Sequence, residues 1–246
     1  MLNLYKKIGE TPLECLNRFR IFNPAYKNTT LSYAGRLDPM AEGVLLVMEG
    51  DENKRRDTYL NFDKEYETEI VFGVSTDTFD VLGLVSSCVG SAFDASYART
   101  LIDGMPRSFD QEYPPYSSKT VGGVPLFELA RKGVSFILPK KHVSLSRSIV
   151  LSVRSLSFVE LLNCVEGKIA LVKGDFRQEA IGARWREVLS KDYSFVVLKL
   201  SLVASSGFYV RTFADVLGKK VGCGATVLSI KRMRAGTYTV GDSLVF

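Results

Sequence analysis

The sequence predicts an α+β fold in one large domain covering residues 1–246. Three observations indicate this: strand and helix patterns alternate along the chain, no repeat or low-complexity tract interrupts them, and no linker-like stretch separates two parts. The 246 residues are 46% hydrophobic, which is enough apolar material to bury a substantial core. The elements are expected in the following order.

The N-terminal part contains two candidate helix starts. A helix is predicted after Thr11, because Pro12 suits the first helical position and Glu14 completes a capping box with the threonine. The stretch YAGRLDPMAEGVLLV follows at residues 33–47. Its Asp38 is a favoured helix cap and precedes a proline, so local rules predict a second helix there. A reactive carboxylate is the other interpretation of this aspartate.

The next segment combines a strand with an acidic loop. In KEYETEIVFG, residues 64–73, Tyr66 falls on the face that carries the apolar residues, while glutamates occupy the other face. This predicts a strand with a buried tyrosine. The following VSTDTFDVLG carries Asp77 and Asp80, and two carboxylates in a loop that ends in glycine form Asx turns more often than a metal site. Turns are therefore predicted.

Two helices and a long loop are expected in the middle of the chain. AFDASYARTLIDG predicts a helix that ends at Gly104, and VPLFELARKG predicts a short helix that stops at Gly133. Between them, YPPYSSKTVGG is rich in proline and glycine and predicts an irregular segment. Such loops often carry binding residues.

The C-terminal half is rich in strand patterns. VSLSRSIVLSVRSLSFVELL and FVVLKLSLVAS both predict strands. Between them, residues 163–193 look like an insertion with an amphipathic helix that carries Ile181 and Trp185, and nothing in the sequence assigns this segment a role. SSGFYVRTFADVLGKKVG then predicts a turn and a helix that ends at Gly218, with Arg211 near its beginning.

Composition excludes several classes of function. No run of about eighteen apolar residues is present, and the opening MLNLYKKIGE lacks the apolar centre of a signal peptide, so a cytoplasmic protein without a membrane span is expected. The four cysteines lie far apart and His142 is the only histidine, which argues against metal sites, disulfides and Ser-His or Cys-His catalysis. Acid–base chemistry would fall to carboxylates, tyrosines or lysines.

The charge distribution favours a nucleic-acid partner. The net charge is +5, and the positive residues gather in clusters such as ENKRRD, LPKKH and IKRMR. Clusters of this kind suit a surface that follows a phosphate backbone.

Four motifs in order resemble those of the TruB family of RNA pseudouridine synthases. They are AGRLDPMAEGVLLV, KEYETEIVFGVSTDTFDVLG, YPPYSSKTVGGVPLFELARKG and SSGFYVRTFADVLGKKVGCGA, and the similarity covers roughly residues 1 to 240. The resemblance implies a mixed, mostly antiparallel central sheet flanked by helices, with an active-site cleft across the sheet.

The resemblance also assigns roles to five residues. Asp38 corresponds to the catalytic aspartate, Tyr66 to the tyrosine that stacks on the target uracil, and Arg211 to the arginine that pairs with the aspartate. Tyr209 and Ile230 fall where the family lines its uracil pocket. The chemistry fits, because a carboxylate can act as nucleophile or base without a cofactor, and a guanidinium keeps it ionised and oriented.

Some positions depart from the family pattern. Tyr33 stands where the family usually has a histidine, and Lys6 belongs to an N-terminal motif that lacks the family's proline; both are candidate substrate contacts. Lys119 lies one position from the family's lysine. The chain ends at GTYTVGDSLVF, which leaves no room for the PUA-type RNA-binding domain of many relatives.

The function implied is isomerisation of uridine to pseudouridine in RNA, most directly uridine 55 in the T stem-loop of tRNA. The expected enzyme needs no cofactor or metal and acts as a monomer. A non-catalytic RNA-binding or RNA-folding protein on the same scaffold is the alternative. A third interpretation, a hydrolase with a carboxylate pair, depends only on the i, i+4 spacing of Asp38 and Glu42.

Overall fold

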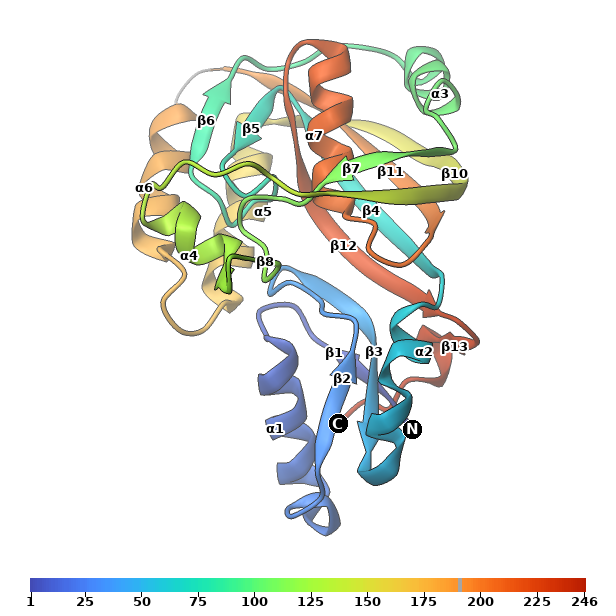
Figure 1. Cartoon of the computed structure of the whole chain (residues 1–246). Helices are drawn as coiled ribbons and strands as arrows, with labels where there is room; N and C mark the ends of the chain where they lie inside the picture. Colours follow the sequence, from blue (N-terminus) through green and yellow to red (C-terminus); the bar gives the residue numbers. More distant parts are fainter. Residues whose placement is uncertain (190–191) are drawn as a thin grey trace.

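The computed structural model describes residues 1–189 and 192–246 and has a nine-stranded sheet at its centre (Figure 1). Seven strands follow in the order β1-β3-β12-β4-β11-β10-β7, while β2 pairs with β3 and β13 with β12. The predicted α+β class, with its mixed and mostly antiparallel sheet, is confirmed. The strands of this sheet are β1 (Leu2–Lys6), β2 (Leu31–Ala34), β3 (Ala41–Glu49), β4 (Lys64–Phe72), β7 (Ser108–Glu112), β10 (Lys140–Ser157), β11 (Ser194–Ala204), β12 (Ala225–Ala235) and β13 (Tyr238–Thr239).

Helices and two small ribbons surround the sheet. The ribbons are β5 (Val74–Thr76) with β6 (Val85–Cys88), and β8 (Thr120–Val121) with β9 (Val124–Pro125). The α-helices are α1 (Pro12–Phe22), α2 (Arg56–Leu60), α3 (Ala95–Asp103), α4 (Leu126–Arg131), α5 (Phe158–Leu171), α6 (Gln178–Val188) and α7 (Val210–Val221). Short 3-10 turns cover Pro24–Tyr26, Gly50–Arg55 and Val240–Asp242. None of the helices in the described part of the chain is long and apolar enough to cross a membrane.

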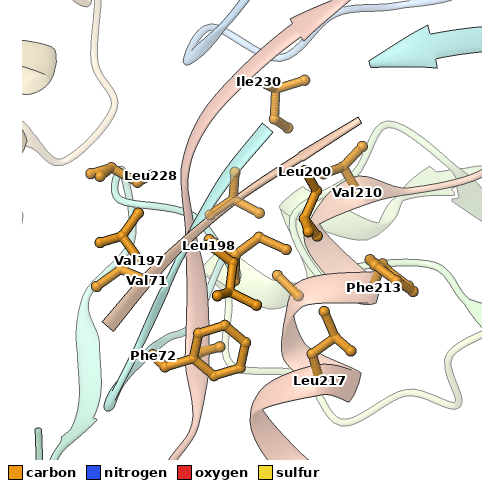
Figure 2. Packing of buried hydrophobic residues seen from close by; sticks show 14 of the residues in the cluster. Val71, Phe72, Val197, Leu198, Leu200, Val210, Phe213, Leu217, Leu228 and Ile230 are labelled. Atoms are coloured by element: carbon orange, nitrogen blue, oxygen red, sulfur yellow. The ribbon is translucent and has the colours of Figure 1, made fainter. Parts of the chain in front are cut away.

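The main core joins the central strands to α7 and also includes buried residues of α5 and α6. Figure 2 shows Val210, Phe213 and Leu217 of this helix opposite the buried residues of the central strands. Phe213 and Leu217 are fully buried, and so are Leu198 and Leu200 of β11. Burial of a side chain of this size stabilises the fold by about 1.5–3 kcal/mol. The packing fixes the N-terminus of α7, and with it Arg211, against the sheet.

Several predicted elements are confirmed. Helix α1 begins with the predicted capping box: the Thr11 side chain accepts a hydrogen bond from the Glu14 backbone, and the Glu14 side chain accepts one from the Thr11 backbone. Strand β4 alternates as expected, with Tyr66 on its buried face. Helix α3 ends beside Gly104, and α4 is followed by Gly133.

The helix predicted after Asp38 is wrong. The Ala41 backbone N–H donates to the Asp38 carbonyl at 2.9 Å, which closes one turn, and the chain then enters strand β3. This strand is hydrogen-bonded to β1, β2 and β12 and is buried along most of its length. A strand buried on both faces has a continuous apolar sequence, so the period of two that identifies strands is missing. Asp38 and Glu42 are therefore not one helical turn apart on a common helix face, because Asp38 lies in a turn and Glu42 in β3.

Two other element boundaries differ from the prediction. Helix α7 continues through Gly218 and ends at Gly222, whose φ of 81° is left-handed. A Cβ on Gly218 would lie 2.0 Å from the Ala225 backbone nitrogen, so this glycine allows helix and strand to approach closely rather than ending the helix. The strand β10 stops at Ser157, and the FVELL that follows opens α5 through a second capping box formed by Ser157 and Glu160.

The segment 163–193 forms most of a helical hairpin, which we define as α5, α6 and the loop 172–177 between them. The predicted amphipathic helix is α6, and its Ile181 and Trp185 are buried in the main core. The Trp185 indole N–H donates to the Gly83 carbonyl at 3.2 Å. Residues 190–191 of the predicted insertion lie outside the described residues. The hairpin is thus packed onto the sheet domain and approaches the irregular segment near α4 (Figure 1).

Candidate active site

Arg211 is the central side chain of the site. It occupies the first turn of α7 and is only 3% exposed. Its Nη1 donates to the Thr78 carbonyl at 2.9 Å and its Nη2 to the Tyr116 carbonyl at 3.2 Å. Its Nε lies 2.8 Å from Asp38 Oδ2 in an ion pair, without the angle of a directed hydrogen bond. Burial lowers the pKa of Arg211, but the carboxylates of Asp38 and Asp80 outweigh burial, so the guanidinium stays charged.

Asp38 lies in the turn between β2 and β3. Its side chain is 37% exposed, so the carboxylate contacts a buried cation on one side and open space on the other. The turn is fixed at its far end by the hydrogen bonds of β3, and Leu37 beside it is buried. A carboxylate in this position is oriented by a cation and accessible from the cavity, as a nucleophile or base must be.

Asp80 is a second, buried carboxylate beside Arg211. Its Oδ2 lies 3.6 Å from Arg211 Nε, while its Oδ1 accepts hydrogen bonds from the Thr78 hydroxyl at 2.8 Å and the Leu82 backbone N–H at 2.9 Å. Burial raises the pKa of Asp80 to about 6, although the Arg211 guanidinium opposes this shift. The predicted turn is thus confirmed, but sequence reasoning did not place Asp80 in the site.

Five predicted site residues line one cavity of about 380 Å³: Asp38, Tyr66, Tyr209, Arg211 and Ile230. The parallel pairing of β12 with β3 sets Ile230 opposite Ala41, three residues after the catalytic candidate. Strand β4 adds Tyr66 from the other side of β12. The cavity therefore depends on one strand register that joins segments nearly 190 residues apart.

Tyr66 forms a buried wall of the cavity. It is 9% exposed, and burial raises the pKa of its hydroxyl, which therefore stays protonated at neutral pH. Arg232 lies directly across the strand pair from Tyr66. The Arg232 guanidinium is itself held by the carbonyls of Val44 at 2.6 Å, Gly35 at 3.2 Å and Arg36 at 3.4 Å. A fixed cation therefore lies beside Tyr66, and its charge opposes the rise that burial causes in the pKa of the hydroxyl.

Tyr209 is held at the start of α7 by its own backbone. Gln111 accepts a hydrogen bond from the Tyr209 N–H at 2.7 Å and donates one to its carbonyl at 3.0 Å. The ring packs edge-on against Tyr113, with 5.4 Å between centroids. Burial, followed by the Asp38 charge, raises the pKa of Tyr209 to about 12. The site therefore has two neutral tyrosines and an apolar Ile230 around one carboxylate.

Two predicted contacts lie elsewhere. Tyr33 on β2 lines a neighbouring cavity of about 510 Å³ that shares Asp38 and Arg211 with the first. Lys6 lines neither cavity: it is fully buried and donates to the Ala41 carbonyl at 2.6 Å and the Lys7 carbonyl at 3.1 Å. Burial lowers the pKa of Lys6 to about 8. These two hydrogen bonds connect Lys6 to the backbone beside the turn that carries Asp38.

Sequence reasoning missed several residues that line the first cavity, among them Arg36, Lys64, Tyr113, Lys141 and Arg232. Lys64 stands two positions before Tyr66 in the same alternating strand, so strand periodicity could have placed both on one face. Burial lowers the pKa of Lys64 to about 8. Lys141 and Arg232 belong to the basic clusters LPKKH and IKRMR, which predict a phosphate-binding surface but do not single out these two residues. The ammonium of Lys119, one position from the family's lysine, lies 5.3 Å from the centroid of the Tyr113 ring.

The carboxylates considered as metal ligands or as a hydrolytic pair have other partners. Asp77 forms an ion pair with Arg177 at 2.8 Å, whereas Asp80 faces Arg211. The Glu42 carboxylate accepts a hydrogen bond of 2.5 Å from the Tyr5 hydroxyl. Among residues 1–189 and 192–246, no group of three or more His, Cys, Asp or Glu side chains is placed to hold a metal ion.

The chain is similar to known proteins in family, sequence and fold. The family described as TruB family pseudouridylate synthase (N terminal domain) matches residues 24–169. tRNA pseudouridine synthase B of Bacillus licheniformis is 27% identical over 248 residues, which cover all of this chain and 68% of the relative. The protein of the same name from Blochmanniella floridana is 29% identical over 242 residues, covering 97% of this chain and 76% of the relative.

Solved structures show the same fold. A Cbf5-Nop10-Gar1 complex matches with a TM-score of 0.59 at 14% identity, and an H/ACA RNP bound to a substrate RNA containing 2′-deoxyuridine matches with 0.57 at 13%. Each match covers 97% of this chain but only about half of the longer chain, 49% and 48% respectively. Together with the family match over more than half of the residues, these findings show that the chain belongs to the TruB family of pseudouridylate synthases.

Proposed function

We propose that this pseudouridine synthase converts uridine to pseudouridine in tRNA, at uridine 55 of the T loop, with Asp38 as its catalytic residue. The observation that carries the proposal is the accessible Asp38 carboxylate, held by a buried Arg211 at 2.8 Å in a cavity with Tyr66 and Tyr209. The names of the relatives from Bacillus licheniformis and Blochmanniella floridana, both tRNA pseudouridine synthase B, support tRNA as the substrate.

The reaction is an internal transfer of the ribose from N1 to C5 of the uracil. In one route an Asp38 oxygen forms a bond to C1′ while the electron pair of the N1–C1′ bond leaves with the base. The uracil then turns, its C5 attacks C1′ and displaces the aspartate, C5 loses its proton and N1 gains one. In the other route Asp38 removes the C2′ proton, so that a C1′–C2′ double bond forms and the electron pair of the N1–C1′ bond leaves with the base. C5 then bonds to C1′ as Asp38 returns the proton to C2′, and C5 loses its own proton while N1 gains one. Both routes conserve all atoms and use no cofactor.

The cavity walls suit a base that must turn without escaping. The Tyr66 ring offers a face on which a uracil can stack, and its neutral hydroxyl can relay a proton. Tyr209 and Ile230 limit the space around the detached base. Arg36, Lys64 and Lys141 line the same cavity and supply positive charge for the neighbouring phosphates.

The cavity is complete within one chain, which supports a monomer as the active form. We place the enzyme in the cytoplasm, where tRNA is processed. The alternative, a non-catalytic RNA-binding protein, retains the same scaffold. The ion pair of Asp38 argues against this alternative. A carboxylate that faces open space repels the phosphates of RNA, so a protein that only binds RNA gains nothing from it, whereas a catalyst needs it.

The decisive experiment incubates the protein with an unmodified tRNA transcript and maps pseudouridine at every uridine. We expect one modified position, at uridine 55, and the same product from an isolated T stem-loop. A transcript with cytidine at position 55 is the matched control and should bind without reaction. Binding of both RNAs with no pseudouridine in either would support the non-catalytic alternative, and modification only at another uridine would correct the proposed site.

A further inference from the structure

We infer that Arg177, in the loop of the helical hairpin, is a positioning residue that fixes Arg211 and through it Asp38. The inference rests on the proposed function, because its readout is uridine isomerisation. It gives a role to the hairpin, which the sequence left without one. The side chains that carry it are Arg177, Asp77 and Tyr116.

Arg177 contacts both loops that hold Arg211. Its Nη1 donates to Asp77 Oδ2 at 2.8 Å and to the Tyr116 hydroxyl at 3.0 Å, and its Nη2 donates to Asp77 Oδ1 at 3.4 Å. The guanidinium also lies over the Tyr116 ring, 4.6 Å from its centroid. A cation over an aromatic face and a two-point contact with a carboxylate are both favourable and orienting.

The same two loops provide the acceptors of Arg211. One acceptor is the carbonyl of Thr78, the residue after Asp77, and the other is the carbonyl of Tyr116. Arg177 therefore connects the loop 77–84 to the loop 113–118, and these are the two loops whose carbonyls bind Arg211. Without that connection the two carbonyls are free to separate, and the guanidinium that orients Asp38 loses its fixed frame.

Two further features indicate that this contact is built into the fold. Arg177 has a left-handed backbone, with φ of 62°, which costs energy for a residue other than glycine and orients its side chain toward the two loops. The hairpin makes a second connection to the same region, because Arg131 at the end of α4 donates to the Asp175 carbonyl at 3.2 Å. The hairpin loop thus holds the segment 113–131 at two points.

The test compares Arg177→Ala with Arg186→Ala in single-turnover isomerisation of a T stem-loop. Arg186 is the matched control, since it lies on α6 and its ion pair with Glu166, at 2.6 Å, joins the two helices of the hairpin. At saturating RNA we expect about a 10-fold lower rate constant for Arg177→Ala, because small displacements of reacting groups cost one to two orders of magnitude. The dissociation constant should change less than about 3-fold, and Arg186→Ala should behave as wild type.

A double-mutant cycle with Arg211→Lys separates positioning from other roles. If Arg177 acts through Arg211, Arg177→Ala should cost less than about 3-fold in the Arg211→Lys background. An equal loss in both backgrounds would overturn the inference, as would an effect confined to the dissociation constant or the same loss in Arg186→Ala.

The variant Arg177→Gly removes the side chain and also relieves the left-handed backbone, so its rate constant should match that of Arg177→Ala. A fully active glycine variant would also overturn the inference. Should Arg177→Ala unfold, Arg177→Gly takes its place in the cycle. An inactive wild type would contradict the proposed function instead.

Discussion

Arg211 Nε lies 2.8 Å from Asp38 Oδ2 and 3.6 Å from Asp80 Oδ2, so one buried guanidinium separates two carboxylates of different exposure. Asp38 faces the cavity, whereas Asp80 is buried and holds its other oxygen in hydrogen bonds. In the proposed mechanism the exposed carboxylate carries out the chemistry, and the buried carboxylate helps to fix the arginine. The predictions below test each part of it.

Asp38→Asn should abolish pseudouridine formation, because the amide is neither a carboxylate nucleophile nor a base. The turn depends on the backbone carbonyl of Asp38, which the substitution keeps. The cost in unfolding free energy should be about 1 kcal/mol, since the lost charge is partly exposed and Arg211 retains Asp80. A melting curve, an RNA titration and pseudouridine mapping measure the three effects. Isomerisation by this variant would remove Asp38 from the mechanism.

Arg211→Ala should lose activity and about 3–5 kcal/mol of stability, because it leaves Asp80 as a buried carboxylate without its cation and two carbonyls without donors. Arg211→Lys should recover part of both, since one ammonium cannot reach two carbonyls and a carboxylate in the same geometry. Urea unfolding measures the stability of each protein. Single-turnover assays, run below the lowest melting temperature of the three proteins, measure the activity. Full turnover by the alanine variant would contradict the proposed ion pair.

Tyr66→Phe should distinguish the contribution of the ring from that of the hydroxyl. The ring still stacks on a base, so RNA affinity should stay within about 3-fold of wild type, while the isomerisation rate should fall if the hydroxyl relays a proton. Tyr66→Leu removes the aromatic face and should weaken both. Rates at saturating RNA and dissociation constants are compared for the two variants. Equal activity of wild type and Tyr66→Phe would limit the role of the tyrosine to stacking.

Asp80 should make stability depend on pH. Its pKa rises on folding from 3.8 to about 6, so the folded state binds the proton more tightly than the unfolded state. This contribution is fully present below pH 3.8 and is lost as the pH rises through 6. The loss is on the order of 2–3 kcal/mol. Asp80→Asn should remove it, so the difference in unfolding free energy between variant and wild type should change between pH 4 and 7. A constant difference would show that Asp80 does not titrate there.

Two glycines in helices should respond to alanine with opposite signs. Gly218→Ala should destabilise α7 against β12, because the new Cβ would lie 2.0 Å from the Ala225 nitrogen and 2.4 Å from the Gly224 carbonyl carbon. Gly167→Ala in α5 meets nothing within 4 Å and should stabilise the protein by up to about 1 kcal/mol through helix propensity. Thermal melts of both variants test the pair. A stabilised Gly218→Ala would contradict the close approach.

Some parts of this structure follow from local sequence alone. The Thr11 capping box forms within four residues, and the alternation around Tyr66 needs only the pleat of one strand, so both were predictable. The motifs around Asp38, Tyr66 and Arg211 also identified the residues that line the cavity, because a resemblance in four ordered segments carries information about the site. Tyr33 and Lys6 stand in altered motifs, and the structure places them outside this cavity.

Other parts were decided only by packing between distant segments. The chain after Asp38 contains a favoured helix start, yet three partner strands supply hydrogen bonds that make residues 41–49 a strand. Glycine often ends a helix, but at position 218 it stands inside α7, where the close approach of Ala225 leaves no space for a side chain. Asp80 and Arg177 enter the network through contacts across 131 and 100 residues respectively, where Asp80 meets Arg211 and Arg177 meets Asp77. Local propensities describe only neighbours in sequence, whereas register, burial and charge pairing depend on which surfaces meet after folding.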